Sequence, residues 1–124
     1  MASGTMKYEG SVDTGQFAML KIGTSTVVTS GDWMANRTLK IVEVSFHNLQ
    51  TGAALTPSSN YTVGSLTAFK PYNKIAMDVN RYNGGSAVGT LEINTTGDIK
   101  LYPLDNIPSG VVLRAHATYF YTGN

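Results

Sequence analysis

The feature that most constrains the fold is a period of two in the spacing of apolar side chains, which is clearest near the end of the chain. On one face of the segment 110–121 stand Val111, Leu113, Ala115, Ala117, Tyr119 and Tyr121. The residues between them are Val112, Arg114, His116, Thr118 and Phe120. Because successive side chains of a β-strand point to opposite faces, this alternation predicts one long strand rich in β-branched and aromatic residues.

Further segments show the same period and are separated by turn residues. The strand expected over 38–47 changes phase near its start, which indicates either a bulge or cover on both faces. A hairpin is expected over 88–102, with a turn at 94–98 where Gly97 supplies a positive φ. Seven or eight short strands predict an all-β fold, a single-domain antiparallel β-barrel or jelly-roll-like sandwich without helices. The remaining strands are expected at 17–22, 26–29, 61–66 and 74–79.

Length and composition limit the organisation of the chain and the class of its partners. The 124 residues suit one domain, expected over residues 10–124, after a flexible leader over residues 1–9. Charged residues make up only 14% and the net charge is +1, which argues against binding to duplex nucleic acid. The sequence has no apolar run that would span a membrane or form a secretory signal. Without cysteine there are no disulfides, thiolate metal sites or thiol catalysis.

No motif of the chain indicates an enzyme. The two histidines, His47 and His116, lie on different expected strands with no further ligand nearby, so we expect neither a metal nor a cofactor. The glycine-rich segment 84–86 lacks the lysine and the helix of a phosphate-binding loop. The Gly-x-Ser-x-Gly motif of serine hydrolases is absent. The chain is therefore expected to bind a ligand rather than to catalyse a reaction.

Aromatic and amide side chains suit a saccharide ligand. Sugars present apolar faces with hydroxyl rims, and the chain holds Trp33, seven tyrosines and nine asparagines. Trp33 follows the turn-like sequence Ser30-Gly31-Asp32, where its ring either meets a ligand or, as is more usual for so large a side chain, closes the core. Tyr72 and Tyr82 are looser candidates with the same two interpretations.

Several segments of the second half together resemble a known family. The segments that carry the resemblance are Tyr61–Leu66, Phe69-Lys70-Pro71, Val88–Leu101 and the closing Tyr119-Phe120-Tyr121. They are similar to the C-terminal head domain of phage tail receptor-binding proteins, particularly those of siphophages that infect lactococci and related Gram-positive bacteria. The likeness covers about residues 10–124. Similar short sequence patterns also occur in other phage tail and baseplate modules.

The resemblance implies a trimeric β-barrel or jelly-roll head at the tail tip or baseplate, among other tail proteins. This head would attach the virion to a cell-wall saccharide, either a polysaccharide or a teichoic-acid-like polymer. The resemblance also implies a site: a polar pair two residues apart on one strand, an aromatic on the returning strand and an arginine on the next. The pair falls at Glu92 and Asn94, where the family tends to have His and Asp. The aromatic falls at Tyr102, where the family often has Trp, and the arginine at Arg114.

Strand alternation extends this candidate site. Lys100 shares a face with Tyr102, and His116 shares a face with Arg114, so neighbouring strands would bring these side chains into one polar patch. The alternative is an ordinary solvated sheet face. The candidate saccharide-binding residues are therefore Glu92, Asn94, Lys100, Tyr102, Arg114, His116 and Trp33.

Apolar residues on the second face of two strands give separate support for a trimer. Val112 and Phe120 oppose the main apolar row of their strand, and Leu39 and Ile41 do the same on theirs. A second sheet together with a symmetry mate would cover both faces, as would loops or a larger sandwich in a monomer. The competing functions are a structural tail or baseplate module without saccharide binding, a carbohydrate-binding module of a bacterial protein, and, last, a hydrolase.

Overall fold

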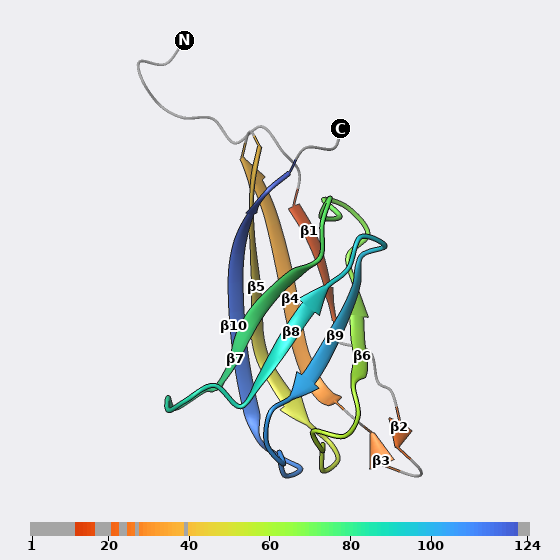
Figure 1. Ribbon diagram of the computed structural model, residues 1–124, viewed down its shortest axis with the longest axis vertical. Coiled ribbons are helices and arrows are strands. Elements are labelled where there is room, and N and C mark those ends of the chain that lie inside the picture. Colours follow the sequence, from red (N-terminus) through yellow and green to blue (C-terminus); the bar gives the residue numbers. More distant parts are fainter. Residues whose placement is uncertain (1–11, 17–20, 23–24, 27, 39, 122–124) are drawn as a thin grey trace.

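The computed structural model describes residues 12–16, 21–22, 25–26, 28–38 and 40–121, and these form strands, turns and loops without a helix (Figure 1). The expected leader over residues 1–9 and most of the expected strand over 17–22 lie outside the described residues. The all-β class predicted from the period of two is confirmed. The strands are β1 (Val12–Gln16), β2 (Lys21–Ile22), β3 (Ser25–Thr26), β4 (Val28–Thr38), β5 (Ile41–Thr51), β6 (Tyr61–Ser65), β7 (Ile75–Arg81), β8 (Gly89–Ile93), β9 (Asp98–Pro103) and β10 (Val112–Phe120).

Eight of these strands form one antiparallel sheet in the order β1-β4-β5-β10-β7-β8-β9-β6, and β2 pairs with β3 in a separate hairpin. The sheet curls, so that β1 and β6, its two end strands, come close to each other (Figure 1). One face of every long strand therefore lines the inside of the curl, and the other face points outward. This geometry explains the period of two, because only the inner face is closed off from water.

The core fills the inside of the curl. On β10 the inner side chains of Leu113 and Tyr119 are buried, whereas Arg114, His116 and Phe120 on the outer face are exposed. The same alternation runs through β5, β7, β8 and β9. The largest fully buried side chains are Phe46, Leu49, Leu55, Leu66, Leu91, Ile93, Ile99, Leu101, Ile107 and Leu113.

Two loops close one end of the curl and are joined by hydrogen bonds. Leu55 and Ile107 form an isolated antiparallel bridge, with N–H to O distances of 2.8 and 2.9 Å. The buried hydroxyl of Thr51 donates to the carbonyl of Pro108 at 2.7 Å and accepts from the amide of Val111 at 3.0 Å. A buried hydroxyl needs such partners to offset the loss of water, so Thr51 fixes the loop that leads into β10.

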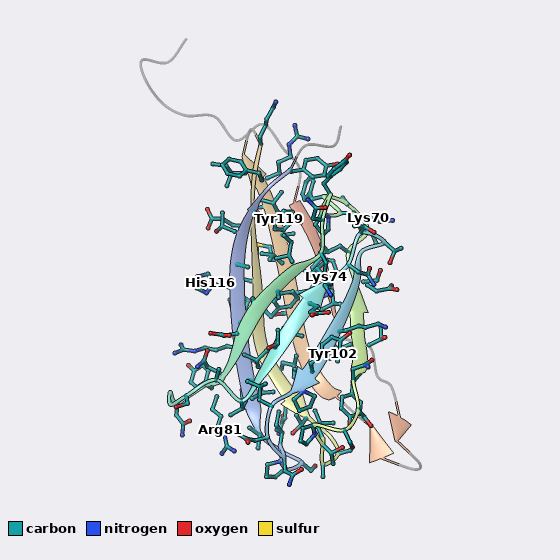
Figure 2. The ribbon with its side chains drawn as sticks, viewed as in Figure 1. Lys70, Lys74, Arg81, Tyr102, His116 and Tyr119 are labelled. Carbon is teal, nitrogen blue, oxygen red and sulfur yellow. The ribbon has the colours of Figure 1, made fainter. Side chains whose placement is uncertain are left out.

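An aromatic group closes the opposite end. Phe69 is buried and has a φ of 56°, a backbone conformation that residues other than glycine rarely adopt. The hydroxyl of Tyr119 donates to its carbonyl, and the ring of Tyr121 meets the Phe69 ring edge-on at 5.9 Å. The guanidinium of Arg37 lies 5.3 Å from the centre of the Tyr121 ring. Figure 2 shows Tyr119 and Lys70 near this end of the molecule.

Two local expectations about the first sheet strands are wrong. Ser30-Gly31-Asp32 reads as a turn, yet these residues lie inside β4, where Gly31 has a φ of 134° and the register with β5 shifts. The bulge expected near the start of the 38–47 strand lies instead at Asn48, whose φ is 51°. Ile41 sits on the outer face of β5 and is 44% exposed, whereas Leu39 lies outside the described residues.

Candidate functional site

The β8–β9 hairpin carries three of the predicted site residues on the outer face. Glu92 is the register partner of Lys100, and Tyr102 is the partner of Thr90. All four side chains are partly exposed. The carboxylate of Glu92 also lies 3.7 Å from the ammonium of Lys74. The expectation that Lys100 and Tyr102 share a face of one strand, beside the strand of Glu92, is therefore confirmed.

Asn94 directly follows β8, and its backbone amide still donates to the carbonyl of Asp98 at 3.1 Å. Its side-chain oxygen accepts from the amides of Thr96 and Asp98 at 3.1 and 3.0 Å and from the hydroxyl of Thr96. Such an Asx turn replaces backbone partners in the tight connection between the strands. The Asn94 side chain thus stabilises the turn that Gly97 completes with a φ of 94°, and the polar pair with Glu92 stays a prediction.

Trp33 belongs to the core, which is the alternative that the sequence already favoured. Its side chain is only 3% exposed, so the faces of the indole are not offered to a ligand. A β-carbon placed on Gly64 of β6 would lie 3.2 Å from the indole nitrogen, which shows how closely the ring packs across the curl. Among the described residues that nitrogen has no hydrogen-bond partner. We therefore remove Trp33 from the candidate site.

The structure separates the remaining residues into two groups. Arg114 and His116 are exposed on β10, and the sheet order places β7 and β8 between β10 and β9. Three strand spacings amount to about 14 Å along the sheet. The single patch expected from neighbouring strands is therefore not formed. Figure 2 shows His116 beside β10 on the left of the molecule and Tyr102 near β9, with β7 and β8 between them.

Arg114 and His116 instead line a hollow on the outer face, which we call the β10 hollow. It has a volume of about 560 Å³ and is open to solvent. It forms where β10 and β7 part, because these strands pair only at Leu113–Arg81 and Arg114–Asn80. The lining residues are Ser45, Phe46, His47 and Asn48 from β5, Asp78 and Asn80 from β7, Tyr82 just after β7, and Arg114, Ala115 and His116 from β10.

The bulge in β5 shapes one wall of the β10 hollow. Two residues of β5, His47 and Asn48, lie opposite the single residue Arg114 of β10. Both are exposed, which interrupts the alternation that the rest of β5 follows. Asparagine tolerates the left-handed conformation better than most residues with a side chain. The extra residue thus turns one more polar side chain toward Arg114 than a regular strand would allow.

The charges in the β10 hollow are not neutralised by ion pairs. Within the described part of the chain, neither Arg114 nor Asp78 takes part in an ion pair. The guanidinium offers a planar fork of donors, and the carboxylate accepts from vicinal hydroxyls. Tyr82 is 61% exposed and supplies an aromatic surface at the rim. No group of three or more His, Cys, Asp and Glu residues in the described segments could hold a metal ion.

The arrangement suits reversible binding of a polyhydroxylated ligand. The amide of Asn80 donates to the carbonyl of Gly85 at 3.2 Å, which fixes its orientation and leaves its own oxygen as an acceptor. Donors, acceptors and one aromatic ring then face a site of limited depth. Sequence reasoning missed Asp78, Asn80 and Asn48, and it named Tyr82 only as a loose candidate, because the pairing of β7 with β10 has no local signal.

A scan against models of known families found no match, and no curated protein matches the sequence. Over the residues that are described, no helix is long and apolar enough to cross a membrane. The site geometry and the resemblance of the sequence therefore carry the functional argument.

Proposed function

We propose that this chain is the receptor-binding head domain of a phage tail, exposed at the tail tip or baseplate, and that it attaches the virion to a saccharide of the host cell wall. It acts by binding alone, with no catalytic step, metal or cofactor. The sequence resemblance supports this proposal, and the curled antiparallel sheet is compatible with a barrel-type or jelly-roll head. Nucleic acid and membrane insertion play no part in it.

The β10 hollow is the observation that carries the proposal. It combines a cation without an ion pair, an acceptor carboxylate, amides and an exposed tyrosine in one open depression. Saccharide sites need this combination, because hydroxyl groups require directed donors and acceptors while the ring faces require an apolar surface. Arg114 and His116 thus keep the saccharide-binding role expected from the sequence, together with Asp78 and Tyr82.

A shallow, hydrated site binds weakly, so attachment requires several copies. We propose a homotrimer that contacts other tail or baseplate proteins. Phe120 on β10 and Ile41 on β5 are register partners on the outer face, with 77% and 44% of their surface exposed. An exposed apolar pair of this kind is typical of a contact surface between subunits.

Binding to purified cell walls tests the attachment function. Walls of lactococci and related Gram-positive bacteria are incubated with the wild-type domain and with Arg114→Ala, His116→Ala and Lys70→Ala. We expect Arg114→Ala to weaken binding roughly tenfold or more, since hydrogen bonds from a charged group are worth about 1.5–3 kcal/mol. Lys70→Ala removes an exposed cation outside the hollow and should bind as wild type. Equal binding by Arg114→Ala and wild type would count against this site.

The exposed Phe120–Ile41 pair also favours a second function, a structural tail or baseplate module whose ligands are other subunits. Sedimentation of wild type and Phe120→Ser separates the possibilities. A trimer that dissociates in Phe120→Ser and also binds walls supports the attachment head. A trimer that binds no wall from the panel supports the structural module, and a monomer that binds walls supports a carbohydrate-binding module.

A further inference from the structure

We infer that the outer face binds a glycan chain of several sugar units that runs across the strands from the β10 hollow to Tyr102, and not a single sugar. The inference rests on the proposed function and specifies the size of its ligand. It reunites the two groups of residues that lie on separate strands, because the surface between them carries a continuous row of polar side chains.

The row is established by register on the β9 side. Tyr102 of β9 is the partner of Thr90 of β8, and Thr90 is the partner of Asp78 of β7. All three side chains lie on the outer face, since their chain neighbours at Leu101, Leu91 and Met77 or Val79 are buried. Directly opposed residues of neighbouring strands have side chains in contact range. An aromatic ring, a hydroxyl and a carboxylate thus follow one another across three strands.

The row continues on the β10 side. Asn80 is the partner of Arg114, so His116, two residues further along β10, comes next to Asp78, two residues back along β7. The two strands part at this point, and both His116 and Asp78 line the β10 hollow. The far side of the hollow is Ser45 of β5, which is the register partner of His116. The row of polar side chains therefore crosses five consecutive strands of the sheet.

The length of the row sets the length of the ligand. Neighbouring paired strands lie about 4.8 Å apart, and β10 and β7 part at the hollow, so the path from β10 to β9 measures about 14 Å or more. The path crosses about three strand spacings, and a sugar ring is comparable to one spacing in size, so a chain of several units is needed to reach from one end to the other. A single sugar in the β10 hollow would leave Thr90 and Tyr102 without contact.

The flanks of the row also suit a hydroxylated chain. Glu92 and Lys100 lie two residues from Thr90 and Tyr102 on the same face and are partly exposed. They offer an acceptor and a donor beside the β9 end of the path.

Exposed apolar side chains lie at both ends of the row as well as at the rim of the hollow. Met34 is the register partner of Ser45 at the β5 end, and Leu104 lies two residues beyond Tyr102 at the β9 end. Tyr82 lies at the rim of the hollow.

Size-graded fragments of wall polysaccharide from the same bacterial panel test the inference, with the dissociation constant measured for each length. We expect the affinity of wild type to rise up to about three or four units and then to level off. Tyr102→Ala should leave the shortest fragments unaffected and weaken binding of the longer ones roughly threefold to tenfold. Tyr72→Ala removes an exposed tyrosine away from the row and should change nothing at any length.

The outcomes separate this inference from the proposed function. An affinity that does not depend on fragment length, or a Tyr102→Ala domain that binds every length like wild type, overturns the extended site while the attachment function stands. An equal loss at every length also overturns it, because Tyr102 would then act through the fold. If no fragment of the panel binds to wild type, the attachment function itself fails and the inference with it. Circular dichroism of each variant verifies that the sheet is intact.

Discussion

The two faces of β10 differ in what they contribute, although they alternate residue by residue. The inner face holds Leu113 and Tyr119 inside the curled sheet, where surrounding strands exclude water. The outer face holds Arg114, His116 and Phe120, which have little protein contact and are proposed to bind saccharide and a second subunit. The comparison teaches that one strand separates stability from recognition by the direction of its side chains. Substitutions on the two faces should therefore affect different measurements.

The largest effect on stability is expected on the inner face. Leu113→Ala removes a fully buried side chain and should lower the free energy of unfolding by about 2–5 kcal/mol, through lost burial and the cavity left behind. Thr118→Ala on the exposed face of the same strand should change it by less than about 0.5 kcal/mol. Urea unfolding followed by circular dichroism measures both. Similar losses of unfolding free energy in the two variants would contradict the difference between the inner and outer faces of β10.

The next effect is expected at the turn of the β8–β9 hairpin. Gly97 has a φ of 94°, and a β-carbon there would lie 2.6 Å from the carbonyl oxygen of Leu66. Gly97→Ala should cost more than the roughly 1–3 kcal/mol of backbone strain alone. Gly85→Ala is a matched control, since Gly85 has a φ of 99° with nothing within 4 Å of the added carbon. The difference in thermal midpoint between the two variants measures the clash, and equal midpoints would refute it.

A smaller effect on stability, with a clear effect on binding, is expected at the bulge. Asn48→Val places a β-branched residue at a φ of 51° and should cost about 1 kcal/mol or somewhat more. Because Asn48 is the extra outward residue of the bulge and lines the β10 hollow opposite Arg114, a change of its backbone conformation should also weaken binding to cell walls. Asn48→Gly keeps the backbone conformation and should retain most of the binding. Equal binding by Asn48→Val and Asn48→Gly would show that the bulge does not shape the binding site.

The smallest effect is expected at the ion pair on the outer face. Lys74 and Glu92 lie 3.7 Å apart, with 61% and 22% of their side chains exposed. Exposed pairs of this kind contribute little, because water screens them and two long side chains lose freedom. Lys74→Ala should change the free energy of unfolding by less than about 0.5 kcal/mol in the same urea experiment. A loss above about 1 kcal/mol would mean that the outer face also contributes to stability.

The sequence was most informative where the structure is local. The period of two identified β10, and the turn residues around Gly97 identified the β8–β9 hairpin. In β4 the local signal was misleading, because Gly31 and Asp32 mark an irregular register inside a strand and not a turn. A glycine with positive φ occurs both in turns and at irregular positions inside strands, and only the pairing with β5 shows that Gly31 belongs to a strand.

The candidate site was predicted in part for the same reason. Arg114 and His116 were identified as outward residues of one strand, a property of alternation alone. Their neighbours Asp78 and Asn80 come from a strand more than thirty residues away in the chain. The order of strands in the sheet cannot be predicted from the spacing of apolar residues within one segment. The role of Asn94 in the turn was missed, because the same amide that suits a sugar also suits a tight turn.

The burial of Trp33 has a practical consequence for spectroscopy. It is the single tryptophan of the chain, and its indole lies within the curled sheet, away from the β10 hollow. Its fluorescence should be blue-shifted in the native state and move to longer wavelength as the sheet opens and water reaches the ring. Occupation of the outer face should leave that emission unchanged, so the protein carries an intrinsic optical probe that reports folding independently of ligand.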